Sequence, residues 1–199
     1  MTLKIPKRTE TIKRRIEEYE NYLKAEKRKF GGYDDSGGIR YLIGPYYMLA
    51  GDLDGALKHY KWFTRIFHDD IGEPGQYLCW TLALYKSGDL KKAYIKFLHT
   101  LFMNPYVIAR VIRIDYQLPY KPNSNIPTKE WADYIPLEIY NLWDEEAAAW
   151  LKESFNLEKT QDLLQKYNKI GKRLETEPVG PERSRLVREH SAIERIEIT

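Results

Sequence analysis

The side chains in this sequence best suited to covalent chemistry are one cysteine and four histidines, and the cysteine has no partner in the sequence. Cys79 lies in the apolar run Tyr77-Leu78-Cys79-Trp80, which predicts a buried thiol. A nucleophilic thiolate needs a neighbouring base or cation, and no motif of that kind accompanies Cys79. A lone cysteine also excludes a disulfide within the chain, which is typical of proteins from a reducing compartment.

The histidines do not form a recognisable metal site. They are His59, His68, His99 and His190, and none belongs to a His-Glu-x-x-His motif or stands near paired cysteines. The triplet His68-Asp69-Asp70 has suitable residue types, but its place at the end of a predicted helix favours a solvated turn. The glycines at 31–32 and 37–38 lack the Lys-Ser/Thr pair of a phosphate loop. We therefore expect no catalytic residues, no cofactor and no metal, and do not expect an enzyme.

Helical periodicity dominates the elements that would have to position such groups. Ile12, Ile16, Tyr19 and Leu23 recur every three or four residues, which predicts an amphipathic helix over residues 9–29. Residues 39–113 are rich in helix formers and aromatic side chains, and no alternating strand pattern competes with them. Three prolines make residues 118–127 irregular, and helical spacing returns over 137–155 and 163–174. The sequence thus predicts an all-α protein.

An internal repeat is the most specific feature of the sequence. The triplet Gly51-Asp52-Leu53 recurs 37 residues later as Gly88-Asp89-Leu90. At the same offset a small and an aromatic residue also align, namely Ala56 with Ala93 and Tyr60 with Phe97. Glycine permits a tight turn, alanine lets two helices approach closely, and the aromatic ring fills the gap between neighbouring pairs.

This pattern resembles the tetratricopeptide repeat (TPR) family, whose units are helix pairs of about 34 residues. The resemblance implies antiparallel helix pairs stacked as a short right-handed solenoid with N- and C-terminal flanking helices. Pro45 would lie inside the first helix and kink or delay it, and Pro105 would stop the second helix of the second copy. The chain then divides into an N-terminal helix and loop (a cap) at 1–36, two TPR-like helix pairs at 37–113, an irregular connection at 114–127, a degenerate third helix pair at 128–176, and a linker with a charged tail at 177–199.

The resemblance also implies a concave groove, and hence a non-catalytic scaffold that holds a partner helix or peptide. The groove would be largely apolar and aromatic, lined by Tyr41, Pro45, Met48, Leu78, Leu82, Tyr85 and Lys86. Chaperone-binding members of the family clamp a carboxylate with Lys, Arg and Asn at such positions, and those charges are missing here. We therefore expect no binding to the acidic tails of heat-shock chaperones. Alternatively, the chain's own N-terminal helix or its 182–199 tail fills the groove.

Nucleic-acid or ribonucleoprotein binding is the other function to weigh. The first 30 residues carry ten Lys or Arg against five Asp or Glu, although the whole chain has a net charge of only +3. The basic residues are Lys4, Lys7, Arg8, Lys13, Arg14, Arg15, Lys24, Lys27, Arg28 and Lys29. Tyr19 and Tyr22 could stack on bases between them. Against this, three acidic residues of the same helix, Glu17, Glu18 and Glu20, favour an ordinary solvated face.

Location and assembly follow from simpler features. No stretch of about 18 apolar residues is present, so we expect no membrane span. The N-terminus turns charged at once and lacks the apolar core of a signal peptide, which favours the cytoplasm. An uncapped end repeat could also pair with a second copy of the chain, so self-association stays open.

Overall fold

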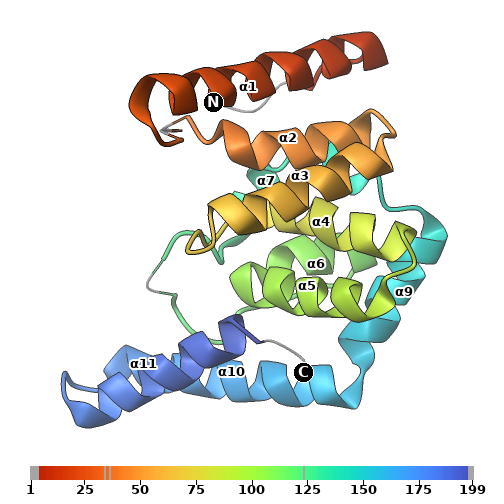
Figure 1. Cartoon of the computed structure of the whole chain (residues 1–199). Helices are drawn as coiled ribbons and strands as arrows, with labels where there is room; N and C mark the ends of the chain where they lie inside the picture. Colours follow the sequence, from red (N-terminus) through yellow and green to blue (C-terminus); the bar gives the residue numbers. More distant parts are fainter. Residues whose placement is uncertain (1–4, 34, 36, 123, 197–199) are drawn as a thin grey trace.

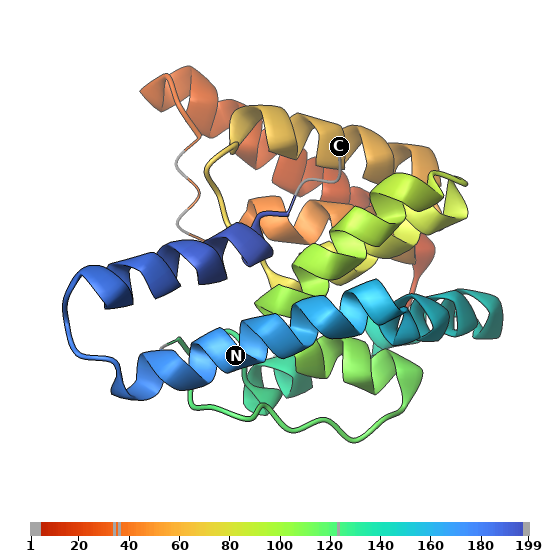
Figure 2. The same cartoon turned by 90° about the horizontal axis from the view of Figure 1, so that it is seen from below.

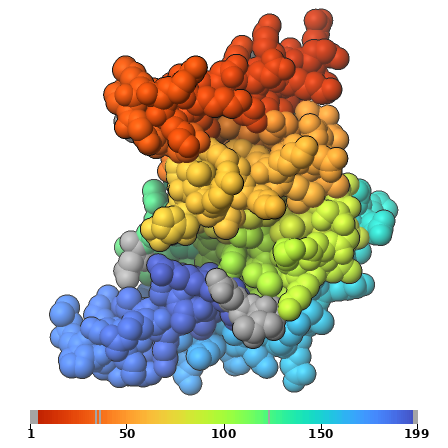
Figure 3. All heavy atoms as spheres, viewed as in Figure 1, coloured from red at the N-terminus to blue at the C-terminus, as the bar shows by residue number. Residues whose placement is uncertain are grey.

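A computed structural model describes residues 5–33, 35, 37–122 and 124–196. These residues form eleven helices and no strand, which confirms the all-α prediction. The helices stack in layers from α1 at one end to α10 and α11 at the other (Figure 1), and the surface shows the same order in bands (Figure 3). Their bounds are α1 Thr9–Phe30, α2 Ile39–Leu49, α3 Leu53–Ile66, α4 Pro74–Lys86, α5 Leu90–Met103, α6 Pro105–Ile112, α7 Lys129–Tyr134, α8 Leu137–Tyr140, α9 Glu145–Asn156, α10 Glu158–Thr176 and α11 Pro181–Glu194.

Helix α1 covers one end of the stack with its apolar stripe. Ile12, Ile16 and Leu23 are buried in a cluster with residues of α2, at the positions that the periodicity predicted. Gly31 ends the helix in the left-handed conformation with φ of 76°, and its N–H donates to the carbonyl of Lys27. The predicted helix over residues 9–29 is therefore confirmed, one residue longer at its C-terminal end.

Helices α2–α3 and α4–α5 form two packed pairs joined by the same turn. Gly51 and Gly88 occupy the left-handed region with φ of 73° and 80°. The next residue caps the second helix of each pair, because the carboxylates of Asp52 and Asp89 accept backbone hydrogen bonds from three residues further on, at 2.8 and 3.2 Å. The helix pairing that the repeat predicted is thus present in both copies.

The small and aromatic residues of the repeat lie where the helices cross. Ala56, Ala93 and Phe97 are fully buried. Tyr60 is 1% exposed, and its ring stacks on Trp80 of the next pair with 4.8 Å between ring centroids. Aromatic stacking of this kind adds to the area that the rings bury. The Tyr60 ring therefore ties α3 to α4, as the repeat pattern indicated.

Helix α2 runs through Pro45 instead of starting late. Its first turn is fixed by Asp35, whose side-chain oxygens accept hydrogen bonds from the N–H groups of Ile39 and Arg40 at 2.9 and 2.7 Å. A carboxylate at this end of a helix satisfies free N–H groups and compensates the helix dipole. Helix α2 therefore begins at Ile39, before Pro45, and includes the proline.

Pro105 begins a helix as well as following one, which the repeat pattern did not predict. Helix α5 ends at Met103, and the side chain of Asn104 then accepts hydrogen bonds from the N–H groups of Tyr106 and Val107 at 3.0 and 3.3 Å. Proline is well suited to the first position of a helix, where its missing N–H would have no partner. Residues 37–113 therefore hold five helices, two pairs and α6.

The chain after α6 returns along one face of the stack. An irregular connection runs along the outside (Figure 2), and α7, α8 and α9 then pack against α2, α4 and α6. Asp144 caps α9, its carboxylate accepting from the N–H of Ala147 at 2.9 Å. Of these, α8 lies on α2 and α9 on α4, the first helices of the two pairs, and this is the face where the groove was predicted.

Helices α10 and α11 close the other end. Only Leu157 separates α9 from α10, so the chain bends there, and α10 packs more extensively against α11 than against α9. The expected third pair, α9 with α10, is thus arranged differently from the first two. The charged tail forms α11, which docks on α5 and α10 through the buried Leu186 and Ile193. Within the described part of the chain, none of the helices combines the length and apolar character that crossing a membrane requires.

Candidate functional site

The seven predicted groove residues fall into three groups. Met48, Leu78 and Leu82 belong to the core and are 7%, 0% and 0% exposed, so they offer a partner almost no surface. The inward side of α2 and α4 here packs against other helices of the same chain. The other four predicted residues lie at the two ends of the predicted groove.

The end near the C-terminus of α4 is covered by α9. Tyr85 packs on Trp150 with 4.8 Å between ring centroids, and its hydroxyl donates to Glu146 at 3.4 Å. Lys86 Nζ donates to Asp144 Oδ2 at 2.8 Å. The chain itself therefore occupies this part of the groove, and it does so with residues 144–150 instead of α1 or the 182–199 tail.

The other end remains open as a cavity of about 530 Å³. Tyr41 and Pro45 of α2 form one wall, the start of α4 forms another, and α7 and α8 form the third. The chain brings these walls together from distant parts of the sequence. The lining residues are Ile5, Asp35, Gly37, Gly38, Arg40, Tyr41, Leu42, Pro45, Tyr46, Leu49, Glu73, Gly75, Gln76, Trp131, Tyr134, Ile135, Pro136 and Ile139.

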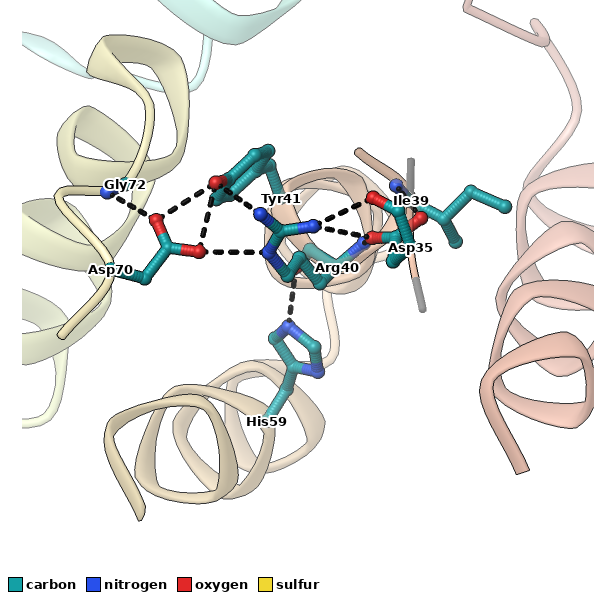
Figure 4. A network of polar contacts seen from close by, with 7 residues as sticks. All are labelled: Asp35, Ile39, Arg40, Tyr41, His59, Asp70 and Gly72. Atoms are coloured by element: carbon teal, nitrogen blue, oxygen red, sulfur yellow. Dashed lines mark hydrogen bonds and ion pairs between the residues drawn. The ribbon is translucent and has the colours of Figure 1, made fainter. Parts of the chain in front are cut away.

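A network around Arg40 fixes one side of the cavity (Figure 4). The guanidinium donates to Asp70 Oδ2 at 2.8 Å and to Asp35 Oδ2 at 3.2 Å, and it also donates to the Tyr41 hydroxyl at 2.6 Å. That hydroxyl donates in turn to Asp70 Oδ1 at 2.8 Å. The Asp35 side chain is fully buried, and burial together with the hydrogen bond to Asp70 raises the pKa of Tyr41. Both carboxylates thus share a single cation, which joins Asp35 to Asp70 across the start of α2.

His59 supports this network from α3. Its Nε2 lies 3.0 Å from the backbone carbonyl oxygen of Arg40 (Figure 4), and because a carbonyl can only accept, Nε2 carries the proton. Burial lowers the pKa of His59 to about 4. The imidazole is therefore neutral at physiological pH and acts as a hydrogen-bond donor to α2.

Gln76 forms part of the cavity wall and has no internal partner. Its side chain is 2% exposed, and neither Oε1 nor Nε2 makes a hydrogen bond within the described residues. A side-chain amide offers two donors and one oxygen acceptor. Burying it unpaired costs about 1–3 kcal/mol, so most buried polar groups in proteins are paired. The fold therefore leaves both polar atoms of this side chain without a hydrogen-bond partner in the described residues.

Glu73 stands one turn before Gln76, at the start of α4. It is half-buried, and burial raises the pKa of its carboxyl; the charge of Asp70 raises it further, while a hydrogen bond from the Trp131 indole and the charge of Arg40 oppose the rise. No Lys, Arg or His in the described part of the chain forms an ion pair with it. The carboxylate therefore lacks the cation that Asp35 and Asp70 have.

Sequence reasoning found Tyr41 and Pro45 but missed Arg40, Glu73, Gln76 and Trp131. A signal existed for Gln76, because it lies at helical spacing from Cys79 and Ala83, which are buried on the same face of α4. A single amide on an otherwise apolar face is a polar residue that needs a partner. No local pattern marks Trp131, which reaches the cavity only through the return of the chain.

The residues considered for chemistry occupy other places. Cys79 is fully buried, and burial raises the pKa of its thiol. His68 and Asp69 are exposed, whereas Asp70 turns inward to Arg40. Within the described residues no group of three or more His, Cys, Asp and Glu side chains is placed to hold a metal ion.

Comparisons of this chain with protein-family models, with characterised proteins and with solved structures find no match. The TPR resemblance therefore rests on the repeat and on the turns, caps and crossings described above.

Proposed function

We propose that this chain is a non-catalytic protein-binding scaffold that holds an extended peptide segment of a partner in the cavity between α2, α4, α7 and α8. The observation that supports this best is the unpaired, buried amide of Gln76. A peptide main chain presents one N–H and one C=O per residue, and a side-chain amide can pair with both groups of a peptide unit at once. Both amide atoms are buried from solvent, so a bound segment would pair with them after the Gln76 side chain turns into the cavity.

The architecture fits the same proposal. In a TPR-like right-handed solenoid, α1 is the N-terminal cap, α2–α3 and α4–α5 are two repeats, and α6 is the first helix of an incomplete third. Such stacks bind partners on the face formed by the first helix of each pair. In this chain α7 to α9 cover part of that face and leave the cavity between α2, α4, α7 and α8 open.

The test is a selection from random peptides displayed on phage, followed by titration calorimetry of the selected sequences. We expect Gln76→Leu to weaken them by about tenfold or more, since a peptide group would then be left unpaired. The same substitution should raise the free energy of unfolding by about 1 kcal/mol, because it removes an unsatisfied buried amide.

Gln165→Leu, on the exposed side of α10, is the matched control and should change neither quantity. Failure to select any peptide, or selected peptides that bind Gln76→Leu as tightly as the unaltered chain, would refute the proposal. Higher stability with weaker binding is the combination that separates a binding residue from a structural one.

A second candidate function is nucleic-acid binding by α1, and the exposure of its lysine side chains favours this function. Lys13, Lys27 and Lys29 are exposed, but Arg14 and Lys24 each face a glutamate one turn away, at 3.6 and 3.5 Å. The ring of Tyr19, one of two tyrosines that could stack on bases, packs edge-on against Tyr46 of α2, with 5.8 Å between centroids. A salt-dependent mobility shift with RNA at physiological ionic strength would support this function, and its absence would remove it.

A further inference from the structure

The cavity has more acidic than basic side chains around it. Asp35 and Asp70 share the guanidinium of Arg40, and among the described residues no other basic side chain lines the cavity or belongs to the network beside it. Glu73 adds a third carboxylate with no cation of its own within the described residues. The cavity is therefore complementary to a positively charged group and unfavourable to a negatively charged one.

The start of α4 does not reverse this preference. Free N–H groups at a helix N-terminus attract anions, but here Pro74 removes one N–H and the carboxylate of Glu73 stands at the cap position. That carboxylate makes no capping hydrogen bond, but its charge lies at the helix end that an anionic ligand would approach. The same helix end that often binds phosphate elsewhere is thus already compensated by a negative charge.

Aromatic rings lie beside the unpaired carboxylate. Trp131 both lines the cavity and hydrogen-bonds Glu73 through its indole, which holds the ring next to the charge. Tyr134 follows on the next turn of α7 and is 64% exposed. A guanidinium can stack on an indole face while it donates two parallel hydrogen bonds to a carboxylate, whereas an ammonium offers only a point charge. Glu73 with Trp131 therefore suits arginine better than lysine.

Gln76 lies within reach of the same ligand. Glu73 is the N-cap residue of α4 and Gln76 lies in its first turn, and both residues line the cavity. The Glu73 carboxylate would bind the side chain of one ligand residue, and the Gln76 amide would pair with the peptide group next to it. Within the described residues, Glu73 forms no ion pair and the Gln76 amide makes no hydrogen bond.

From this geometry we infer that the cavity recognises an arginine residue of a partner peptide, with the guanidinium on Glu73 against Trp131 and the adjoining peptide group on Gln76. The inference rests on the proposed peptide-binding function and adds the side chain that the site selects. It also explains why an acidic chaperone tail would be rejected, since such a tail would bring carboxylates next to Glu73.

The experiment uses the full chain and three defined probes. These are acetyl-Gly-Arg-Gly-amide, the same peptide with citrulline in place of arginine, and the same peptide with glutamate. Binding is followed through the ¹H–¹⁵N resonances of the Gln76 side-chain amide and the Trp131 indole. We expect the arginine peptide to shift both, the citrulline peptide to bind about tenfold more weakly because only the charge is lost, and the glutamate peptide to shift neither.

Two variants separate the parts of the inference. Glu73→Gln should abolish the preference for arginine over citrulline, while Gln76→Leu should weaken both peptides by the same factor. Equal binding of arginine and citrulline to the unaltered chain would overturn the arginine inference and leave peptide binding intact. If no peptide shifts either resonance, both proposals fall.

Discussion

The ring of Tyr60 fills the space that a side chain on Gly44 would need: a Cβ on Gly44 would lie 2.4 Å from Cε1 of Tyr60. No real Cβ comes that close to a ring carbon, so α2 and α3 can pack at this crossing only because residue 44 has no side chain. The Tyr60 ring also stacks on Trp80 of the second pair. The ring cannot yield without disturbing the contact with the second pair.

Gly44→Ala should therefore destabilise the protein. Alanine is favoured over glycine in a helix by up to about 1 kcal/mol, but overpacking a rigid crossing costs about 1–3 kcal/mol, and the crossing should win. Urea unfolding should show a lower midpoint with an unchanged slope. Gly32→Ala is the control, because a Cβ there meets no atom within 4 Å, and it should leave the midpoint in place. An unchanged midpoint for Gly44→Ala would contradict this packing.

Local chemistry explains why the two helix pairs could be predicted. The Gly-Asp turns at 51–52 and 88–89 combine a left-handed glycine with a capping carboxylate, and both requirements can be read from neighbouring residues. The break at Asn104-Pro105 uses local chemistry too, but there the same proline fits both the end of one helix and the start of another. The Gly-Asp pairs predict a turn unambiguously, whereas Asn104-Pro105 is compatible with a helix end, a helix start or both.

The cavity was less predictable because its decisive properties depend on tertiary structure. Tyr41 and Pro45 could be assigned to the groove from their place in the repeat. Gln76 matters because it is buried without a partner, and Trp131 matters because the chain returns to it over a long connection. Neither property follows from residue type or spacing within a single helix.

Removal of Arg40 should be costly. Arg40→Met leaves the fully buried Asp35 side chain without its cation. Breaking such a pair lowers the free energy of unfolding by about 3–5 kcal/mol when both groups are buried. Because the Arg40 side chain is 18% exposed, we expect a loss of about 2–4 kcal/mol. Lys129→Met removes an exposed ion pair with Asp133 and should cost less than about 0.5 kcal/mol. Similar costs for the two variants, measured by urea unfolding, would show that the Arg40 network contributes little.

The buried histidine makes stability depend on pH. Burial lowers the pKa of His59 to about 4, while an unfolded histidine titrates near 6.5. Between these values the unfolded state binds the proton and the folded state does not, so stability falls as pH decreases from 6.5 to 4, by about 2–3 kcal/mol from this residue. His59→Gln should lose that part of the slope in unfolding free energies measured at pH 7, 5.5 and 4.5. Parallel profiles for the variant and the unaltered chain would refute the assignment.

The contact between α4 and α9 can be tested by zero-length crosslinking. Lys86 Nζ and Asp144 Oδ2 are 2.8 Å apart, so a water-soluble carbodiimide should join them by an amide bond. Mass spectrometry of the digested monomer should find the link, and its yield should not depend on protein concentration. Lys86→Arg keeps the positive charge, but a guanidinium does not form that amide bond, so this variant should lose the link.

The location of the link decides between two arrangements of the groove. A link within the monomer means that α9 of the same chain covers Tyr85 and Lys86, which leaves the cavity at Gln76 as the open part of the groove. A link found only in crosslinked dimers would instead place α9 of a second copy over α4. The self-association that the sequence left open would then be the role of this end of the groove, and the monomer would expose both ends to a partner.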